Sequence, residues 1–175
     1  MSNVFSLMDF IPVYRCFETE KTDECPEKTN NDWVRNLEEI GKIGENLVKE
    51  FLETQYNAIV KKQPDYKGYD FKVEMNKITL AVEVKTSYGE YNHFYMSYNE
   101  IRKAKELAEY YNLYYVCLDD TKRSLFVMNN PYEVLGLEKV FNVMETNEVV
   151  SMKIEEIELS IKDYSGFTII NNFSN

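Results

Sequence analysis

The segment LAVEVKTS, residues 80–87, decides the fold and the candidate site of this chain. Alternate side chains of a β-strand point to opposite faces of the sheet. Val82 and Val84 therefore share one face, while Glu83 and Lys85 share the other. Such a strand is either half-exposed, with an ordinary wet face, or it presents an acid and a lysine together for chemistry.

The sequence on either side of this strand predicts an α/β domain. Residues 32–56 carry apolar side chains at three- and four-residue steps, which is typical of one helix face. A second helix is predicted over residues 98–112, with Ser97 as its N-cap and Glu100 at capping-box spacing. Strands are predicted at residues 57–63, 70–75, 78–87, 94–96, 113–120 and 123–130. This order indicates a mixed β-sheet flanked by helices.

Two local features refine this expectation. Met75-Asn76-Lys77 predicts a hairpin turn between the strands at residues 70–75 and 78–87. Gly41 and Gly44 lie inside the first helix, where each costs about 0.5–1 kcal/mol relative to alanine. The cost predicts either that another backbone approaches closely or that the helix is broken into two.

The chain divides into three predicted parts. Residues 1–31 form an N-terminal arm and polar linker, residues 32–128 form the core, and residues 129–175 form a C-terminal accessory segment packed on it. Short helix and strand pieces are expected at residues 131–138, 139–144 and 151–161.

Composition favours a globular protein of one domain. The chain has 175 residues, 44% of them hydrophobic, and no apolar run near the roughly 20 residues that a membrane-spanning helix needs. The N-terminus has no basic lead, and its apolar residues are interrupted by Asp9 and Pro12, which argues against a signal peptide. Three cysteines without metal-type spacing indicate neither a disulfide framework nor a zinc site. We therefore expect a cytoplasmic protein that does not bind membranes.

The net charge of −10 argues weakly against nucleic-acid binding, because proteins that bind polyanions usually have basic surfaces. The charge is uneven along the chain. Residues 32–118 hold 14 acids and 12 bases, so the central part is close to neutral and the acidity lies mainly at the two ends. A DNA-binding core therefore stays open.

Three carboxylates are predicted to lie on or near the strand at residues 78–87. Asp70 begins the preceding strand, and the predicted hairpin places it beside Glu83 if the pairing register is right. Glu45 follows Gly44, where small residues allow the helix to approach the sheet. Carboxylate oxygens suit Mg²⁺, and Lys85 is placed to position an attacking water or to neutralise a transition state. This chemistry is metal-assisted phosphodiester hydrolysis.

These residues also carry a family resemblance. GYD followed by VEVKT resembles the signature of the PD-(D/E)XK, or restriction-endonuclease-like, nuclease superfamily. The segments EIGKIGENLVKEFL, GYDF, VEVKTS and FYMSYNEIRKA, in that order, resemble the branch named for the C-terminal domain of the plant protein NO VEIN. Together they cover about residues 39–119.

The resemblance implies a restriction-endonuclease-like mixed β-sheet flanked by helices, and metal-dependent cleavage of DNA in restriction, defence or repair. Asp70 and Glu83 would be metal ligands, Glu45 would complete the metal site, and Lys85 would be the catalytic lysine. Mg²⁺ would be the cofactor, with Mn²⁺ able to substitute. A literal Pro-Asp occurs at Pro64-Asp65, but Asp70 is preferred because Asp65 lies in a predicted turn.

Other residues have alternative interpretations. Arg102, Lys103 and Lys105 are candidates for phosphate contacts, or they form a solvated helix face. Tyr98 is a candidate for base stacking, or it packs a loop against the sheet. Glu100 is interpreted as the capping-box partner of its helix rather than as a catalytic acid.

Three functional hypotheses follow from the sequence. The first is an endonuclease that binds DNA, either as a homodimer, which would cut both strands with paired centres, or within a larger defence or repair complex. The second is a catalytically silent protein of the same fold that acts as an acidic interaction or regulatory subunit. The third keeps the site but changes the substrate to RNA or a branched junction.

Overall fold

The computed structural model describes residues 31–89, 93–118, 122–139, 156–160, 166 and 168–174. Most of the predicted N-terminal arm, and residues 140–155 of the predicted C-terminal segment, lie outside the described residues.

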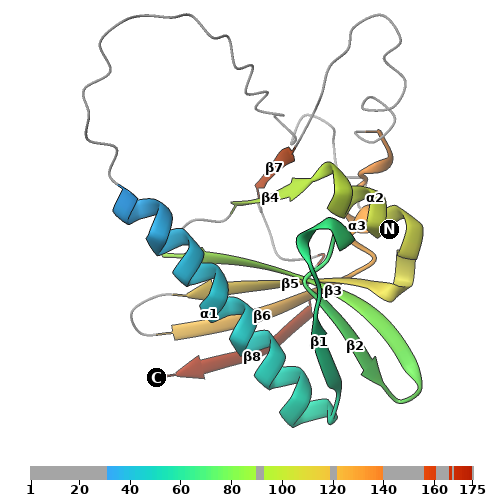
Figure 1. Ribbon diagram of the computed structural model, residues 1–175, viewed down its shortest axis with the longest axis horizontal. Coiled ribbons are helices and arrows are strands. Elements are labelled where there is room, and N and C mark those ends of the chain that lie inside the picture. The colour runs from blue at the N-terminus through green and yellow to red at the C-terminus, as the bar shows by residue number, and fades with distance from the viewer. Residues whose placement is uncertain are drawn as a thin grey trace, which may run out of the picture.

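The described elements follow in the order helix, three strands, a short strand, helix and two strands, with shorter elements after them (Figure 1). The helices are α1 (Asn31–Tyr56), α2 (Tyr98–Leu107) and α3 (Pro131–Val134), with 3₁₀ turns η2 (Asp65–Lys67) and η3 (Ala108–Tyr110). The strands are β1 (Ile59–Lys62), β2 (Phe71–Met75), β3 (Ile78–Tyr88), β4 (His93–Ser97), β5 (Tyr111–Leu118), β6 (Lys122–Asn129), β7 (Glu156–Ser160) and β8 (Thr168–Ser174).

The main sheet has six strands in the order β1-β2-β3-β5-β6-β8. β3 and β5 run parallel, and the other neighbouring strands of this sheet run antiparallel. The sheet is therefore mixed and flanked by helices, which confirms the predicted fold class. β4 and β7 form a separate antiparallel pair that the sequence did not predict.

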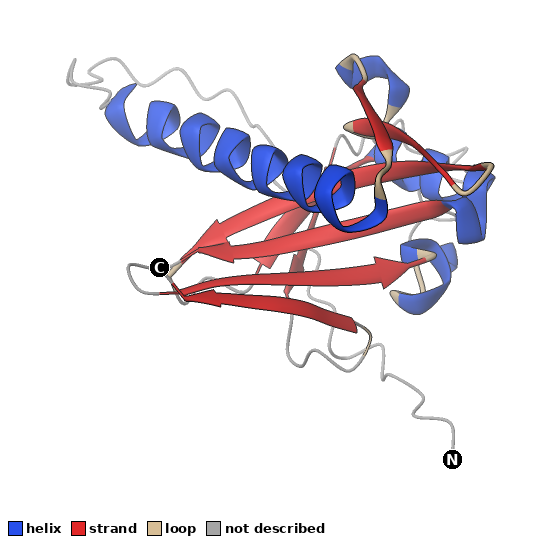
Figure 2. Ribbon diagram, turned by 90° about the horizontal axis from the view of Figure 1, so that it is seen from below, coloured by secondary structure: helices blue, strands red, loops and turns tan. Residues whose placement is uncertain are grey.

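The main sheet has a helix layer on each side. On one face, α1 packs Val48, Phe51 and Leu52 against the apolar side chains of β2, β3 and β5, and Figure 2 shows α1 lying along this face. On the other face, α2 buries Ile101 and Ala104, and a second core includes side chains from β4 and β7. The two faces of β3 therefore meet two different cores.

The turn between β2 and β3 is a two-residue hairpin. Asn76 and Lys77 both have positive φ angles, of 49° and 68°, and Met75 pairs with Ile78. Positive φ at both central residues matches the right-handed twist of the flanking strands. The predicted hairpin is confirmed, and its turn sets the register in which β2 pairs with β3.

The second helix ends earlier than predicted. α2 stops at Leu107 instead of continuing to residue 112, and Ala108 has a φ angle of 47°. Tyr111 instead begins β5, where it is fully buried and its hydroxyl donates a hydrogen bond of 3.0 Å to the Gly68 carbonyl. Burial of a large aromatic ring in the sheet outweighs the helical pattern of this segment.

No helix among the described residues combines the length and the apolar character needed to cross a bilayer.

Candidate active site

The register of the hairpin brings two of the predicted acids together. Phe71 pairs with Val82, so the next step along each strand places Asp70 opposite Glu83. The Asp70 backbone N–H donates to the Val82 carbonyl at 3.0 Å, which fixes this juxtaposition. The sequence left the register open, and the structure gives the register in which Asp70 and Glu83 are opposite each other.

Asp70 lies where the edge of β3 becomes open. The ladder between β2 and β3 begins at Phe71, so Val84 has no strand partner on this side. The Asp70 carboxylate takes that place, because its Oδ2 accepts a hydrogen bond of 2.8 Å from the Val84 N–H. The side chain is therefore held at the edge of the sheet, between its two faces.

The turn before Asp70 is anchored to the second helix layer. Gly68 has a φ angle of 72°, and a Cβ there would lie 2.7 Å from the Asn99 carbonyl oxygen. The side chain of Asn99 also donates to the Tyr66 carbonyl at 2.9 Å. Asp65 lies within this 3₁₀ turn, as predicted, whereas Asp70 directly precedes β2.

Lys62 joins Asp70 to the acid of the long helix. Its Nζ lies 2.8 Å from Asp70 Oδ1 and 2.7 Å from Glu45 Oε2, and 5.1 Å from the centre of the Phe71 ring. Burial by itself would lower the pKa of Lys62, but hydrogen bonds and charge from Asp70 and Glu45 raise it overall. Glu45 is thus linked to Asp70 by the Lys62 ammonium, which contacts both carboxylates.

Glu45 owes its position to the close contact at Gly44. A Cβ at Gly44 would overlap Thr86 Oγ1 and lie 3.0 Å from Thr86 Cβ, whereas a Cβ at Gly41 would meet nothing within 4 Å. α1 is continuous, so the predicted close approach is found at Gly44 and the predicted break is not. The contact is made by a side chain of β3 rather than by backbone.

Lys85 lies between two acids on the other face of β3. Its Nζ is 2.8 Å from Glu83 Oε1 and 2.9 Å from Glu100 Oε2. Only 5% of Glu83 is exposed, so this acid and lysine are not on a wet surface of an ordinary half-exposed strand. Lys85 is also largely withdrawn from solvent, with 17% of its side chain exposed.

Burial and charge shift both members of this pair. Burial raises the pKa of the Glu83 carboxyl well above its usual range, and Glu100 and Asp70 add to the rise while Lys85 opposes it. Burial alone would lower the pKa of Lys85, but the charges of Glu83 and Glu100 raise it above its usual value. A buried carboxylate of this kind favours a cation beside it.

Glu100 has two partners. The Ser97 side chain accepts from the Glu100 N–H at 3.3 Å, and Glu100 Oε2 accepts from the Ser97 N–H at 3.0 Å, which confirms the predicted capping box. The same Oε2 also accepts from Lys85. The acid that begins α2 therefore also holds the lysine of β3.

The sequence analysis missed two features of this arrangement: the position of Lys62, and the contact of Glu100 with Lys85. A signal for Lys62 was present, because it ends a strand eight residues before Asp70 and so lies at the same end of the β1–β2 pair. No local pattern connects Glu100 to Lys85, since the contact depends on where α2 lies on the sheet.

The predicted substrate residues lie on α2, outside these clusters. Arg102 is exposed and donates to Asn99 at 2.9 Å, and Lys103 pairs with Glu106 at 2.6 Å. The Lys105 ammonium lies 6.0 Å from the centre of the Tyr132 ring. Tyr98 is half-buried and packs against the second core, as its alternative interpretation expected.

The described residues contain no group of three or more His, Cys, Asp or Glu side chains placed to hold a metal ion. The three predicted ligands are instead arranged as Asp70 beside Glu83, with Glu45 joined to Asp70 through Lys62. Mg²⁺ takes hard oxygen ligands and is commonly held by one or two protein carboxylates together with substrate phosphates. The donor set of Asp70 and Glu83 fits that requirement.

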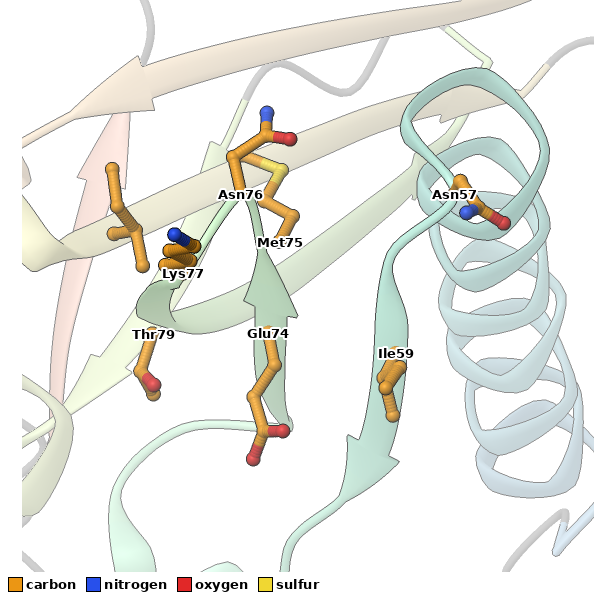
Figure 3. A pocket seen from close by; sticks show the side chains of 8 residues that line it. Asn57, Ile59, Glu74, Met75, Asn76, Lys77 and Thr79 are labelled. Atoms are coloured by element: carbon orange, nitrogen blue, oxygen red, sulfur yellow. The ribbon is translucent and has the colours of Figure 1, made fainter.

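A shallow hollow of about 440 Å³ lies at the opposite end of β2, next to the hairpin turn (Figure 3). Its lining includes one acid, Glu74, which pairs with Lys72 at 2.9 Å and with Lys61 at 3.4 Å. The hollow is therefore separate from the carboxylate clusters.

Comparison with known proteins gives two matches. In a search of solved structures, the chain is similar to the Holliday junction resolvase Hjc of Archaeoglobus fulgidus, an archaeal hyperthermophile. The identity is 12% and the TM-score 0.41, over 69% of this chain and 83% of that chain. No curated protein sequence matches.

The second match is to a protein family. The family model described as protein NO VEIN, C-terminal matches residues 40–128, just over half of the 175 residues. The matched range runs from α1 to β6 and contains Glu45, Asp70, Glu83 and Lys85. The resemblance seen in the sequence is confirmed: the chain belongs to the NO VEIN C-terminal family.

Proposed function

We propose that this chain is a metal-dependent endonuclease that hydrolyses phosphodiester bonds of DNA. The observation that supports it best is the juxtaposition at the open edge of β3. Asp70 and Glu83 are opposite each other there, and Lys85 is held beside Glu83 on the buried face. An ordinary half-exposed strand would not bury an acid and fix a lysine between two carboxylates.

Each residue has a proposed role. Asp70 and Glu83 would hold the metal, and Glu45 would support it from α1. Mg²⁺, or Mn²⁺ in its place, would orient a water and stabilise negative charge on the phosphate. The Lys85 ammonium, fixed by Glu83 and Glu100, would donate hydrogen bonds to the attacking water or to a phosphate oxygen. Water would add to phosphorus, the bond to the leaving oxygen would break, and that oxygen would gain a proton.

DNA would approach across α2. Arg102 is exposed in the middle of this helix, and Lys103 and Lys105 follow it on the same element. These side chains would contact phosphates, which positions a nucleic acid without reading its sequence. Two copies of the chain would present two centres to the two strands of a duplex.

The test uses the full chain and the variants Asp70→Ala and Lys85→Ala, purified identically. Each protein is incubated with supercoiled DNA, linear DNA, a four-way DNA junction and single-stranded RNA, in Mg²⁺, in Mn²⁺ and in EDTA. Lys72→Ala is the matched control, because Lys72 lies on the neighbouring strand and pairs with Glu74 away from the site. We expect metal-dependent cleavage by the wild type and the control, and its loss in both site variants.

The choice of substrate separates the related hypotheses. Cleavage confined to RNA or to the junction would keep the site and change the substrate. Cleavage that persists in Asp70→Ala or Lys85→Ala would point to a contaminating nuclease and would refute the assigned site.

A second candidate function is a non-enzymatic interaction subunit of the same fold. Two observations favour it. The net charge of the chain is −10, and the predicted metal ligands already have lysine partners, Lys62 for Asp70 and Lys85 for Glu83. Such a protein would bind a basic partner and show neither metal-dependent cleavage nor calorimetric binding of Mg²⁺.

A further inference from the structure

The position of Lys62 is the feature of the site that the proposed reaction does not explain. Its ammonium is within hydrogen-bond distance of Glu45 and Asp70, two residues proposed to face the metal. The three come from three different elements: α1, β1 and the residue just before β2. Lys62 is therefore the one group that ties the acid of the helix to the acid at the sheet edge among the described contacts.

Both oxygens of the Asp70 carboxylate are already engaged. Oδ2 accepts from the Val84 N–H at 2.8 Å, and Oδ1 accepts from Lys62 at 2.8 Å. The backbone donor cannot leave without disturbing β3. The lysine can leave more easily, because 46% of its side chain is exposed and β1 is an edge strand of the sheet.

We propose that Lys62 is a built-in counterion of the metal site, which holds Glu45 and Asp70 in the metal-free protein and competes with a divalent cation for them. The proposal rests on the proposed function, since it takes these acids to be metal ligands. Two carboxylates that face each other repel, and an ammonium between them removes that repulsion. A cation that binds Asp70 Oδ1 and Glu45 together must first displace the ammonium.

The neighbouring lysine supplies a matched control. Lys61 lies on the same strand with its side chain on the opposite face, and it pairs with Glu74 at 3.4 Å. Lys61→Met and Lys62→Met remove the same charge from adjacent positions of the same edge strand. Long-range electrostatic effects and effects on the strand edge are therefore similar, and only Lys62→Met empties the space between the two acids.

The experiment measures Mn²⁺ binding by the full-length wild type, Lys61→Met and Lys62→Met, using electron paramagnetic resonance of free Mn²⁺ with no nucleic acid present. We expect Lys62→Met to bind Mn²⁺ roughly tenfold more tightly than Lys61→Met, which is the size expected for losing a partly exposed charged competitor. The gain should disappear when Asp70→Asn is added to Lys62→Met. Circular dichroism verifies that each variant is folded.

Thermal unfolding gives a second readout. In EDTA, Lys62→Met should unfold at a lower temperature than Lys61→Met, because the two acids lose their counterion. Saturating Mn²⁺ should raise its midpoint more than it raises that of Lys61→Met.

The outcomes separate this inference from the proposed function. Equal Mn²⁺ affinity in the two lysine variants, or weaker binding by Lys62→Met, would overturn the inference and leave the metal site standing. Folded proteins that bind no Mn²⁺ in any variant would overturn the metal site and the inference together. Binding that appears only in Lys62→Met, and needs Asp70, would support the inference strongly.

Discussion

The contact between Gly44 and Thr86 allows a quantitative prediction about the packing of α1. Gly44→Ala adds a Cβ that overlaps Thr86 Oγ1, while Gly41→Ala adds one that meets nothing within 4 Å. Both substitutions gain helix propensity, worth up to about 1 kcal/mol each. Only Gly44→Ala forces helix and strand apart, at a cost of about 1–3 kcal/mol.

The two variants should therefore move in opposite directions. We expect Gly41→Ala to raise the free energy of unfolding by about 0.5–1 kcal/mol and Gly44→Ala to lower it by about 1–2 kcal/mol. Near the midpoint, each kcal/mol corresponds to about 2–4 °C for a chain of this size. Urea unfolding followed by circular dichroism measures both values, with the slope on urea as a check on the transition.

A compensating substitution identifies the cause. Thr86→Ala removes the hydroxyl that the new Cβ meets, so Gly44→Ala combined with Thr86→Ala should recover most of the loss. The two substitutions should be non-additive by about 1 kcal/mol or more, because the residues are in contact. A Gly44→Ala protein as stable as Gly41→Ala would refute the reasoning, since the helix would then have room to spare.

Three further predictions concern single contacts. Glu100→Gln should keep the cap of α2 but weaken the contact with Lys85, so the rate of DNA cleavage should fall while the free energy of unfolding changes little. Ser97→Ala should instead lower the free energy of unfolding by about 1 kcal/mol and leave cleavage unchanged. Tyr111→Phe should cost about 1 kcal/mol in urea unfolding, because the Gly68 carbonyl loses its hydroxyl partner. Lys77→Gly should stabilise the hairpin by about 0.5–1 kcal/mol, measured in the same way, because its φ angle is 68°; a stability loss there would show that the turn is not strained.

The part of this fold that could be predicted from sequence is the part fixed by local patterns. Alternation in LAVEVKTS and the short turn at residues 75–77 predicted the hairpin, whereas its register, which places Asp70 opposite Glu83, stayed open until the structure was known. Helical spacing predicted α1, and the Ser97-to-Glu100 spacing predicted the start of α2. Each of these signals involves neighbours in the chain.

The parts that failed depend on contacts between distant segments. The predicted end of α2 was wrong because burial of Tyr111 in the sheet outweighs the local helical pattern. Lys62 and the second partner of Glu100 were missed because their contacts depend on how α1 packs beside the β1–β2 pair and on where α2 lies on the sheet. Side chains that link elements are decided by tertiary packing, and a single sequence contains little trace of it.

The short edge strand β1 has a consequence for how copies of this chain behave at high concentration. An exposed sheet edge offers unpaired backbone groups to another chain and so invites aggregation. β1 has four residues, and Lys61 and Lys62 make up its second half. Charged side chains on a short edge discourage a second strand from pairing there. We therefore expect a chain with apolar residues at both positions to aggregate at lower concentrations than the native chain.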